Sequence, residues 1–261
     1  MQVYRGMDIG TAKPTAEEQH RVPHEMIDVA EPETEFTVAE FRQAARGALE
    51  RKAAPVVMIV GGSGLHFRSV VDPMSFRPTD PVLRADLETT PVETLVAELL
   101  AADPAAGDHV DLSNRRRVLR GIEALRLAGT TPSGWASTDE RRRYQAYEPD
   151  LEFVAFALDS QDPAPAISSR LAEMRDAGFL AEVERLAPRL GRTAAQAVGY
   201  RQLLEVVEGR AGAEEAFEAA ERATMALVKR QRTFFRRDPR LRWLDAGQPD
   251  LADTIMKEAG L

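Results

Sequence analysis

Arginines at helical spacing are the residues of this sequence whose types and positions best suit chemistry. The residues between Ser113 and Gly129 are predicted to form a helix, and at about 100° per residue they place three guanidinium groups opposite an apolar face. Guanidinium groups bind phosphate oxygens in a bidentate manner, so a row of them suits a nucleic-acid backbone. The other interpretation is a solvated charged face. The arginines are Arg116, Arg117 and Arg120, and the apolar face holds Val118, Ile122 and Leu125.

A second predicted helix, from about residue 214 to residue 237, repeats this design. Between Lys229 and Arg242 there are seven basic residues and one acid, a local net charge of +6 in a chain whose formal net charge is -8. A concentrated basic segment binds polyanions even in an acidic protein, because the local potential decides. Two basic helical faces therefore favour a nucleic-acid ligand. The basic side holds Lys229, Arg232, Arg236 and Arg237, and the apolar side holds Leu227, Val228, Phe234 and Phe235.

The glycine-rich segment Gly61-Gly62-Ser63-Gly64 is a candidate anion site of another kind. Backbone amides in such a turn, together with the N-terminus of a following helix, are able to hold an anion. No lysine follows, so the segment is neither a G-x-x-x-x-G-K-[ST] phosphate loop nor a dinucleotide fingerprint. The alternative interpretation is a tight strand-to-helix turn without a ligand.

The carboxylates and histidines are less informative. Asp8, Asp28 and Glu40 are candidates for acid–base or metal chemistry, but their spacing selects none of them. His24, one of four histidines, is interpreted as a structural loop residue. No metal-ligand spacing and no Ser/His/Asp pattern stands out in the sequence.

The elements that must position these groups follow an α/β pattern. Thr37-Val38-Ala39-Glu40 is a capping box, which predicts a helix to about Arg51. Pro55–Val60 is a continuous apolar run of strand length, typical of a central parallel strand covered on both faces. The glycine turn and a further helix from Leu65 follow. This order of elements predicts a parallel-sheet core.

The middle of the chain is predicted to be mainly helical. Thr90-x-x-Glu93, with Pro91 at the first helical position, predicts the start of one helix. Ser113 is the expected cap of another helix, which Gly129 ends. A strand that returns to the sheet is expected at Leu151–Leu158. The predicted domains are residues 1–80 as the first part of the α/β core, residues 81–150 as a helical insertion, and residues 151–261 as the second, mostly helical part of the core.

The composition excludes several classes of protein. A hydrophobic content of 44% over 261 residues is typical of a globular protein rather than a disordered one. The absence of cysteine excludes disulfides, cysteine nucleophiles and thiolate zinc sites. No apolar run approaches the ~18 residues of a membrane span, and the N-terminus lacks the apolar core of a signal peptide. We therefore expect a cytoplasmic protein with no membrane partner.

The segment Gln2–Pro14, which reads Q-V-Y-R-G-M-D-I-G-T-A-K-P, resembles the N-terminal signature of the tRNA dimethylallyltransferase (tRNA isopentenyltransferase) family. Further motifs follow in the family's order and extend the resemblance from residue 1 to about residue 245. One such motif is weak evidence, whereas a series in order is strong. The further motifs are Val22-Pro23-His24 with Ile27-Asp28, Gly61–Leu65, Asp80-Pro81-x-x-Arg84, Asp103-Pro104, Arg117–Arg120 with Glu123, Gly199-Tyr200 and Lys229–Arg236.

The resemblance implies a fold, a reaction and partners. The implied fold is α/β, a P-loop-NTPase-like parallel sheet core with a helical insertion domain. The implied reaction transfers a dimethylallyl group from dimethylallyl diphosphate, with Mg²⁺, to N6 of the adenosine just 3′ of a tRNA anticodon. That adenine must leave its stack, so the resemblance also implies a pocket for the base and basic surfaces for the anticodon stem-loop. We expect a monomer.

Carried over onto this sequence, the family's tRNA-binding positions fall near both ends of the chain, on the glycine turn and on the helical insertion. Two of these groups coincide with the basic helical faces described above. The expected tRNA-binding residues are Met1, Gln2, Ser63, Arg84, Arg116, Arg117, Arg120, Gln196, Gly199, Tyr200, Arg201, Lys229, Arg230, Gln231, Phe234 and Arg236.

One part of the family pattern is missing from residues 1–261. Members begin with a strand, a G-x-T-x-x-G-K-[ST] phosphate loop and a helix, then an Asp-Ser pair directly before the residues that match Met1-Gln2. That loop would hold the diphosphate and Mg²⁺, and that Asp is the expected general base. The core is therefore expected to be incomplete, with its catalytic residues before Met1, and the 261 residues should transfer no measurable isoprenoid. About 35–40 in-frame codons upstream are expected to encode the missing part.

Smaller departures concern side chains that are present. Ser63 stands where the family usually has Thr, His66 where it has Tyr, and Met225 where it has Arg, while Ser160–Pro163 replaces an Arg-x-x-Leu stretch. Two interpretations follow. The first is a transferase whose start was placed at an internal Met, and the alternative is a non-catalytic RNA-binding relative that has lost the diphosphate site. A kinase on the same core would leave the tRNA-facing motifs unexplained.

Overall fold

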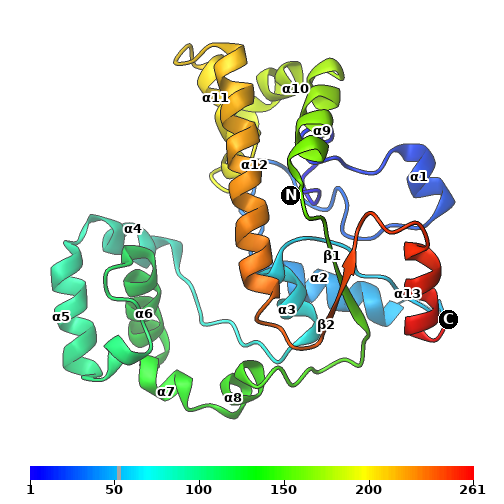
Figure 1. The fold of residues 1–261 in the computed structure, drawn as a ribbon. Helices are drawn as coiled ribbons and strands as arrows, with labels where there is room; N and C mark the ends of the chain where they lie inside the picture. Colours follow the sequence, from blue (N-terminus) through cyan, green and yellow to red (C-terminus); the bar gives the residue numbers. More distant parts are fainter. Residues whose placement is uncertain (52–53) are drawn as a thin grey trace. The chain divides into compact units, whose positions relative to one another are not determined.

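The structure, a computed structural model, describes residues 1–51 and 54–261, which form two compact units. The core unit comprises Met1–Val70 and Phe153–Leu261, and the helical unit comprises Val71–Glu152. Figure 1 follows the chain through both units. Each unit has its own cluster of buried apolar side chains, and each is therefore described by itself.

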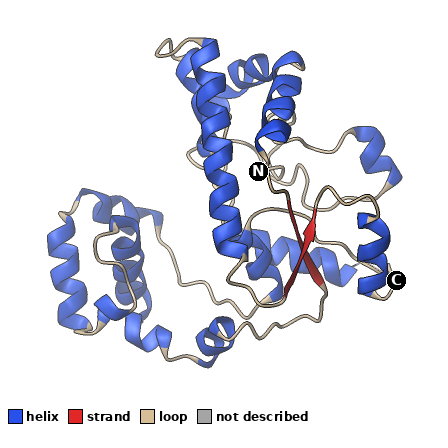
Figure 2. Cartoon of the chain, viewed as in Figure 1, coloured by secondary structure: helices blue, strands red, loops and turns tan. Residues whose placement is uncertain are grey.

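Helices make up most of the core unit, and two short strands complete it (Figure 2). Short 3₁₀ turns at Ala187–Arg189 and Ala194–Gln196 connect α10 to α11. The helices are α1 (Ala16–Arg21), α2 (Val38–Arg51), α3 (Gly64–Val71), α9 (Ala164–Asp176), α10 (Phe179–Leu186), α11 (Tyr200–Val207), α12 (Ala213–Phe235) and α13 (Leu251–Ala259).

The sheet of the core unit is a parallel pair. In β1 (Ala155–Asp159) and β2 (Leu241–Asp245), Ala155 lies opposite Leu241 and Asp159 lies opposite Asp245. Parallel strands need a long crossover connection, and α9 to α12 supply it here. The predicted α/β class is confirmed, with the returning strand starting four residues later than the predicted Leu151. Both strands end in aspartate at the same edge of the sheet.

The central strand predicted at Pro55–Val60 is wrong in this structure. Residues 56–60 have no regular secondary structure, and their side chains are exposed, with Met58 at 76% and Val60 at 83% of full exposure. An apolar run becomes a strand only where a neighbouring backbone pairs with it, and a buried strand also needs both faces covered. No described residue pairs with this run, since the described sheet contains β1 and β2 alone.

The buried cluster of the core unit joins the N-terminal loop to α10, α11 and α12. Tyr4 and Met7 from the loop pack with Phe179, Tyr200 and Phe217, all of them almost completely buried. The rings of Phe179 and Tyr200 meet edge to face, with centroids 5.0 Å apart. Burial stabilises such side chains by about 1.5–3 kcal/mol each. The loop that carries the most specific sequence motif is thus part of the core.

The helical unit is built from short helices around its own apolar cluster. Leu87, Leu95 and Leu99 pack against Val118 and Ile122, which confirms the predicted apolar face of the arginine-bearing helix. Among all described residues, no helix combines the length and apolarity needed to cross a bilayer. The helices of this unit are α4 (Pro81–Thr89), α5 (Val92–Ala102), α6 (Arg115–Ala128), α7 (Pro132–Ala136) and α8 (Asp139–Gln145), with a 3₁₀ turn at Ala106–Asp108.

Helix ends follow the predicted capping signals in part. The Thr37/Glu40 box forms in both directions, with N···O distances of 2.7 and 3.2 Å, and Gly129 ends α6 in the left-handed conformation (φ 61°). The predicted Ser113 cap is wrong, because Asn114 caps α6 and Ser113 bonds to Asp111 instead. Thr90 is likewise not an N-cap: its hydroxyl donates to the carbonyl of Asp86 at the end of α4.

Stability measurements distinguish the exposed run from the predicted buried strand. The double variant Met58→Lys/Val60→Lys is expected to lose less than about 1 kcal/mol, because substitutions of exposed side chains act weakly. As a control, Leu203→Ala in the buried cluster is expected to lose about 2–5 kcal/mol. Urea unfolding followed by circular dichroism measures both. A loss in the double variant as large as that of the control would mean that residues 55–60 form a buried strand after all.

Candidate nucleic-acid interface

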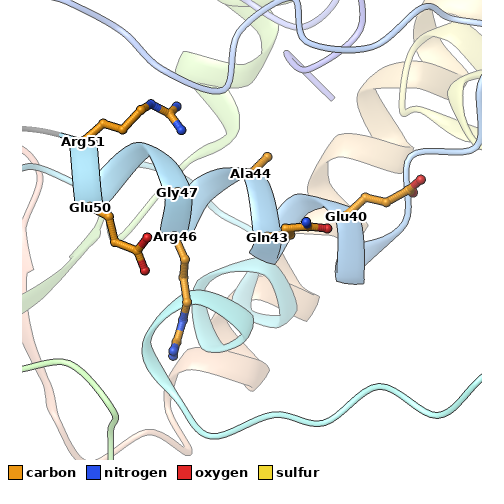
Figure 3. Close-up of a pocket in the computed structure, with 7 residues that line it drawn as sticks. All are labelled: Glu40, Gln43, Ala44, Arg46, Gly47, Glu50 and Arg51. Atoms are coloured by element: carbon orange, nitrogen blue, oxygen red, sulfur yellow. The ribbon is translucent and has the colours of Figure 1, made fainter.

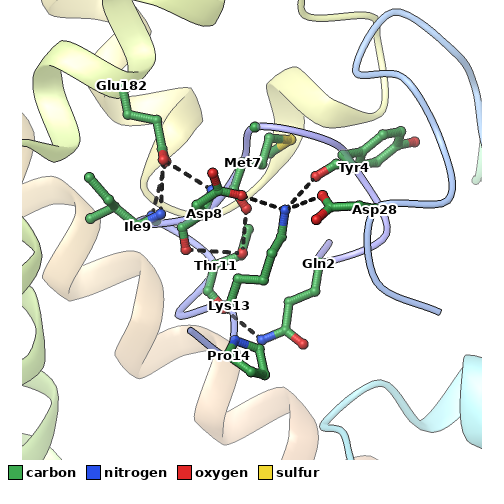
Figure 4. A network of polar contacts seen from close by, with 12 residues as sticks. Gln2, Tyr4, Met7, Asp8, Ile9, Thr11, Lys13, Pro14, Asp28 and Glu182 are labelled. Atoms are coloured by element: carbon green, nitrogen blue, oxygen red, sulfur yellow. Dashed lines mark hydrogen bonds and ion pairs between the residues drawn. The ribbon is translucent and has the colours of Figure 1, made fainter. Parts of the chain in front are cut away.

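The N-terminal loop is organised around a buried lysine (Figure 4). The Nζ atom of Lys13 donates to the carboxylates of Asp8 and Asp28, each at 2.5 Å, and to the carbonyl of Tyr4 at 2.9 Å. The lysine side chain is only 4% exposed, so these contacts replace the water that its charge would otherwise hold. Two of the three carboxylates that the sequence offers for acid–base or metal chemistry are therefore already engaged by a cation.

Unusual backbone conformations surround this lysine. Ala12, Met26 and Asp28 have positive φ values of 48°, 66° and 53°, which cost free energy in residues with a side chain. Gln2 supports the loop, because its amide nitrogen donates to the carbonyls of Thr11 and Ala12 at 3.1 and 3.0 Å. The predicted tRNA-binding residue Gln2 thus also shapes the loop on which it lies.

A buried carboxylate anchors the same loop from the other side. Glu182 of α10, 4% exposed, accepts hydrogen bonds from the backbone amides of Asp8, Ile9 and Gly10 at 2.9–3.1 Å. It also accepts one from the hydroxyl of Tyr200 at 2.5 Å. Burial, and then the hydrogen bond to Glu182, raises the pKa of Tyr200, which stays neutral. Sequence reasoning missed Glu182, because nothing in the spacing of α10 marks it.

Close packing explains two glycines of this region. A Cβ atom at Gly10 would overlap the rings of Phe179 and Tyr200, and one at Gly199 would meet Phe179. Gly199 also has a φ of 89° at the start of α11, a conformation that favours glycine. Of the predicted tRNA-binding residues here, Gly199 and Tyr200 are buried, whereas Gln196 and Arg201 are exposed.

The glycine turn lies directly against the basic end of α12. The Nε2 atom of Gln231 donates to the carbonyl of Gly62 at 3.0 Å. A Cβ atom at Gly62 would meet Gln231, and one at Gly64 would overlap the ring of Phe234. The turn therefore needs glycines because α12 approaches its backbone. The structure brings together three predicted tRNA-binding residues, Ser63, Gln231 and Phe234, from segments far apart in the sequence.

Ser63 has a specific partner within the turn. Its hydroxyl lies 2.7 Å from Nδ1 of His66, and the His66 ring packs edge to face on Phe41 at a centroid distance of 4.6 Å. Burial lowers the pKa of His66, so the neutral ring is favoured at neutral pH, and its Nδ1 atom shares one hydrogen bond with the serine hydroxyl. The His66 replacement noted in the sequence thus fixes the orientation of an exposed hydroxyl.

The carboxyl edge of the sheet carries a shallow hollow with charges of both signs. Asp159, at the end of β1, pairs with Arg232 at 2.7 Å and lies 3.9 Å from Arg236. Ligands of α/β proteins bind at this edge of the sheet. Because it pairs with Asp159, Arg232 is half-buried and structural. Lys229, Arg230 and Arg236 present exposed cations at the same end of α12.

A second hollow lies along α2 (Figure 3), and its lining has no excess of positive charge that would attract RNA. All of its lining residues come from this single helix, and its two glutamates balance its two arginines. Arg46 among them is bound to the backbone, since its Nε atom donates to the carbonyl of Val70 at 2.9 Å.

In the helical unit, two predicted tRNA-binding arginines share one buried carboxylate. Glu123 of α6 is fully buried and accepts from Arg84 of α4 and, at 2.8 Å, from Arg120. Burial opposes ionisation of Glu123, but the hydrogen bonds from both arginines outweigh it and lower the pKa of this carboxyl. Arg120 also donates to the carbonyls of Arg77 and Pro78, so it is structural as well as half-exposed.

The remaining arginines of α6 divide into two kinds. Arg116 and Arg117 are exposed as predicted, and Arg117 has only a loose contact with Asp111 at 3.9 Å. Arg115, in contrast, donates to the carbonyls of Glu88 and Thr90 at 2.8 Å and so joins the end of α4 to α6. At the start of α6, the exposed arginines are therefore Arg116 and Arg117.

Comparison with known proteins gives a consistent result. The sequence matches the IPP transferase family over residues 2–238. The tRNA dimethylallyltransferase of Bifidobacterium longum is 41% identical over 263 residues, covering 98% of this chain and 78% of that protein, and that of Thermobifida fusca is 38% identical, covering 97% and 80%. The solved tRNA isopentenylpyrophosphate transferase of Bacillus halodurans has a TM-score of 0.67 at 31% identity, covering 99% of this chain and 83% of that one.

The shared carboxylate predicts a pH-dependent contribution to stability. Because the pKa of Glu123 is lowered in the folded state, its contribution is complete above the ordinary glutamate pKa of about 4.3 and is lost as the pH falls through the lowered value. Arg120→Ala is therefore expected to cost about 1–3 kcal/mol at pH 7 and less in acid. Arg116→Ala, which removes an exposed charge from the same helix, is the control. Urea unfolding at pH 7 and at an acidic pH measures the loss of unfolding free energy in each variant. Equal losses in the two variants at pH 7 would contradict the prediction.

Proposed function

Because the chain belongs to the IPP transferase family, we propose that it acts in tRNA modification, by transfer of a dimethylallyl group to the adenosine 3′ of the anticodon. The proposed donor is dimethylallyl diphosphate and the acceptor is the exocyclic N6 of adenine. A base in the anticodon loop must be turned out of its stack to be alkylated, so the protein has to hold the loop on both sides of that base. We expect this to take place in the cytoplasm.

The contact between the glycine turn and α12 is the observation that carries this proposal. Gln231 binds the backbone of Gly62, and next to it α12 presents Lys229 and Arg230 to solvent. Exposed cations supply the attraction to the phosphates of an RNA backbone. Ser63 adds an exposed hydroxyl, a suitable partner for phosphate or for a base edge.

The N-terminal loop is the second part of the proposed surface. Lys13 and Glu182 hold it from within, so the exposed Met1 and the half-exposed Gln2 keep a defined position. Pre-ordering of this kind reduces the entropy lost when RNA binds. In this proposal the loop orients the anticodon, while Glu182, Lys13 and the buried Tyr200 act through the backbone rather than on the RNA.

The diphosphate and Mg²⁺ belong to the proposal on the basis of family membership alone. No group of three or more His, Cys, Asp or Glu side chains within 1–51 and 54–261 is arranged to hold a metal ion. Asp8 and Asp28 are engaged by Lys13. No described residue is therefore assigned as a ligand of Mg²⁺, and no chemical step is assigned to the ion.

Binding of tRNA without transfer is the alternative function, and one observation favours it. Met225 of α12 stands where the family pattern has a cation. Both functions use the same RNA surface. They differ in whether dimethylallyl diphosphate is consumed.

Paired binding and transfer assays test the proposal. A labelled anticodon stem-loop with adenosine 3′ of the anticodon is expected to bind the chain, and the same strand in a fully paired duplex is expected to bind more weakly. A version of the chain extended at its N-terminus by the family's strand, phosphate loop and helix is expected to transfer isoprenoid from dimethylallyl diphosphate with Mg²⁺, whereas residues 1–261 alone are expected to transfer no measurable amount. Comparable transfer by the two would refute our assignment of the diphosphate site outside these residues, and transfer by neither would favour binding without transfer. Absence of stem-loop binding at low salt would overturn the RNA function itself.

Salt dependence tests the exposed arginines of α6. The double variant Arg116→Ala/Arg117→Ala is expected to bind the stem-loop more weakly and to lower the slope of log K against log salt by about one unit per lost phosphate contact. Its unfolding free energy is expected to stay within about 1 kcal/mol, because both side chains are exposed. Fluorescence anisotropy at several salt concentrations measures the slope. An unchanged slope would mean that this side of α6 is only a solvated face.

A further inference from the structure

Two arginines lie over the indole ring of Trp135 in the helical unit. The guanidinium carbon of Arg77 is 4.8 Å from the centre of the ring, and that of Arg141 is 4.5 Å from it. Arg141 also lies 5.2 Å from the ring of Tyr144. We call Arg77, Trp135 and Arg141 the arginine–tryptophan stack. It draws on three segments: the chain before α4, the short helix α7, and α8.

Hydrogen bonds hold each part of the stack in place. Ser133, at the start of α7, donates from its backbone amide and its hydroxyl to Asp103, both at 2.7 Å. Arg120 of α6 donates to the carbonyl of Arg77 at 3.1 Å. Thr138 caps α8 and so fixes the start of the helix that carries Arg141. The backbone segments that carry the two arginines and the tryptophan are therefore fixed by the fold.

Positive charge is in excess around the stack. Arg77, Arg84 and Arg120 all interact with one carboxylate, that of Glu123. Burial, followed by the charges of Arg120 and Arg141, lowers the pKa of Arg77. Crowded like charges of this kind are relieved by an anion.

Hydrogen-bond donors are also left over at this place. Within the described ranges, the buried side-chain nitrogens and oxygens that lack a partner are Nε of Arg84, Nε1 of Trp135 and Oε1 of Glu123. All of these atoms belong to the helical unit, and two are donors. Unsatisfied buried donors are costly, and a ligand rich in acceptors would reach them only if its binding moved the neighbouring side chains.

From this juxtaposition we propose that the arginine–tryptophan stack is a binding site for the phosphate groups of RNA. A guanidinium that lies over an indole keeps its N–H groups at its edge, where they can bind a phosphate in a bidentate manner. The proposal rests on the proposed function for the identity of the polyanion, and it adds a site separate from Arg116 and Arg117 on α6.

The chain has two tryptophans, which makes the stack observable. In a Trp243→Phe background, Trp135 is the only source of tryptophan emission. The anticodon stem-loop is expected to change this emission in a saturable, salt-dependent way. Inorganic phosphate at the same phosphate concentration is expected to leave it unchanged. An equal response to inorganic phosphate would mean that the site takes free phosphate and would overturn the RNA assignment.

Variants in the Trp243→Phe background distinguish a direct contact with RNA phosphates from a general effect of net charge. Arg77→Ala/Arg141→Ala is expected to weaken stem-loop binding and to reduce the salt slope by about two units. The matched control is Arg126→Ala/Arg142→Ala, which removes two exposed arginines of the same unit that pair with Glu98 and Asp139. The control is expected to change the slope by less than half as much. Arg77→Lys/Arg141→Lys is expected to keep the slope but to lose affinity, because lysine binds phosphate as a point charge.

The outcomes distinguish this proposal from the proposed function. If stem-loop binding is intact and the salt slopes of the alanine variant and its control are equal, the phosphate site proposed at the stack is overturned, while the proposed RNA function stands. Absence of binding by the parent protein would contradict the RNA function, and the stack with it. Circular dichroism of each variant shows whether the helical unit remains folded. If the alanine variant does not fold, the affinity of the lysine variant tests the stack instead, and an affinity equal to that of the parent protein would overturn it.

Discussion

The proposed RNA surface of the core unit depends on the hydrogen bonds that the carboxylate of Glu182 accepts. One buried side chain accepts three consecutive backbone amides of the N-terminal loop and the hydroxyl of Tyr200. Such a loop has no helix or sheet ladder to satisfy its amides, so a carboxylate in the core takes that role. The same contact joins the loop to α10 and α11, and a neutral side chain would accept these bonds less strongly.

Lys13 completes this arrangement from the opposite side of the loop. Its ammonium group is nearly buried between Asp8 and Asp28, and the positive φ angles of Ala12 and Asp28 bring the backbone around it. A buried charge with only one partner would be destabilising, whereas this one has two carboxylates and a carbonyl. The carboxylates that the sequence offered for chemistry are here used to build the loop.

Some features that depend on neighbouring residues were predicted correctly from the sequence, although the caps expected at Thr90 and Ser113 were not. The capping box at Thr37 and the two faces of α6 depend on residues three or four positions apart, and the structure confirms them. The strand at residues 55–60 was predicted from its apolar composition alone, but strand formation depends on a partner that no described residue supplies. The double role of Arg120 and the anchor at Glu182 depend on contacts between distant segments, which spacing does not reveal.

The distance along the chain between the N-terminal loop and its anchor has a consequence for synthesis. Asp8 and Glu182 are separated by 174 residues, and β1 likewise pairs with a strand that is made 86 residues later. At about 5–20 residues per second, a ribosome adds those 174 residues in roughly 10–35 s. The loop thus leaves the ribosome long before its anchor is made, while the helical unit, whose contacts are local, is able to fold during the wait. A nascent chain therefore orders this loop only after Glu182 has been joined.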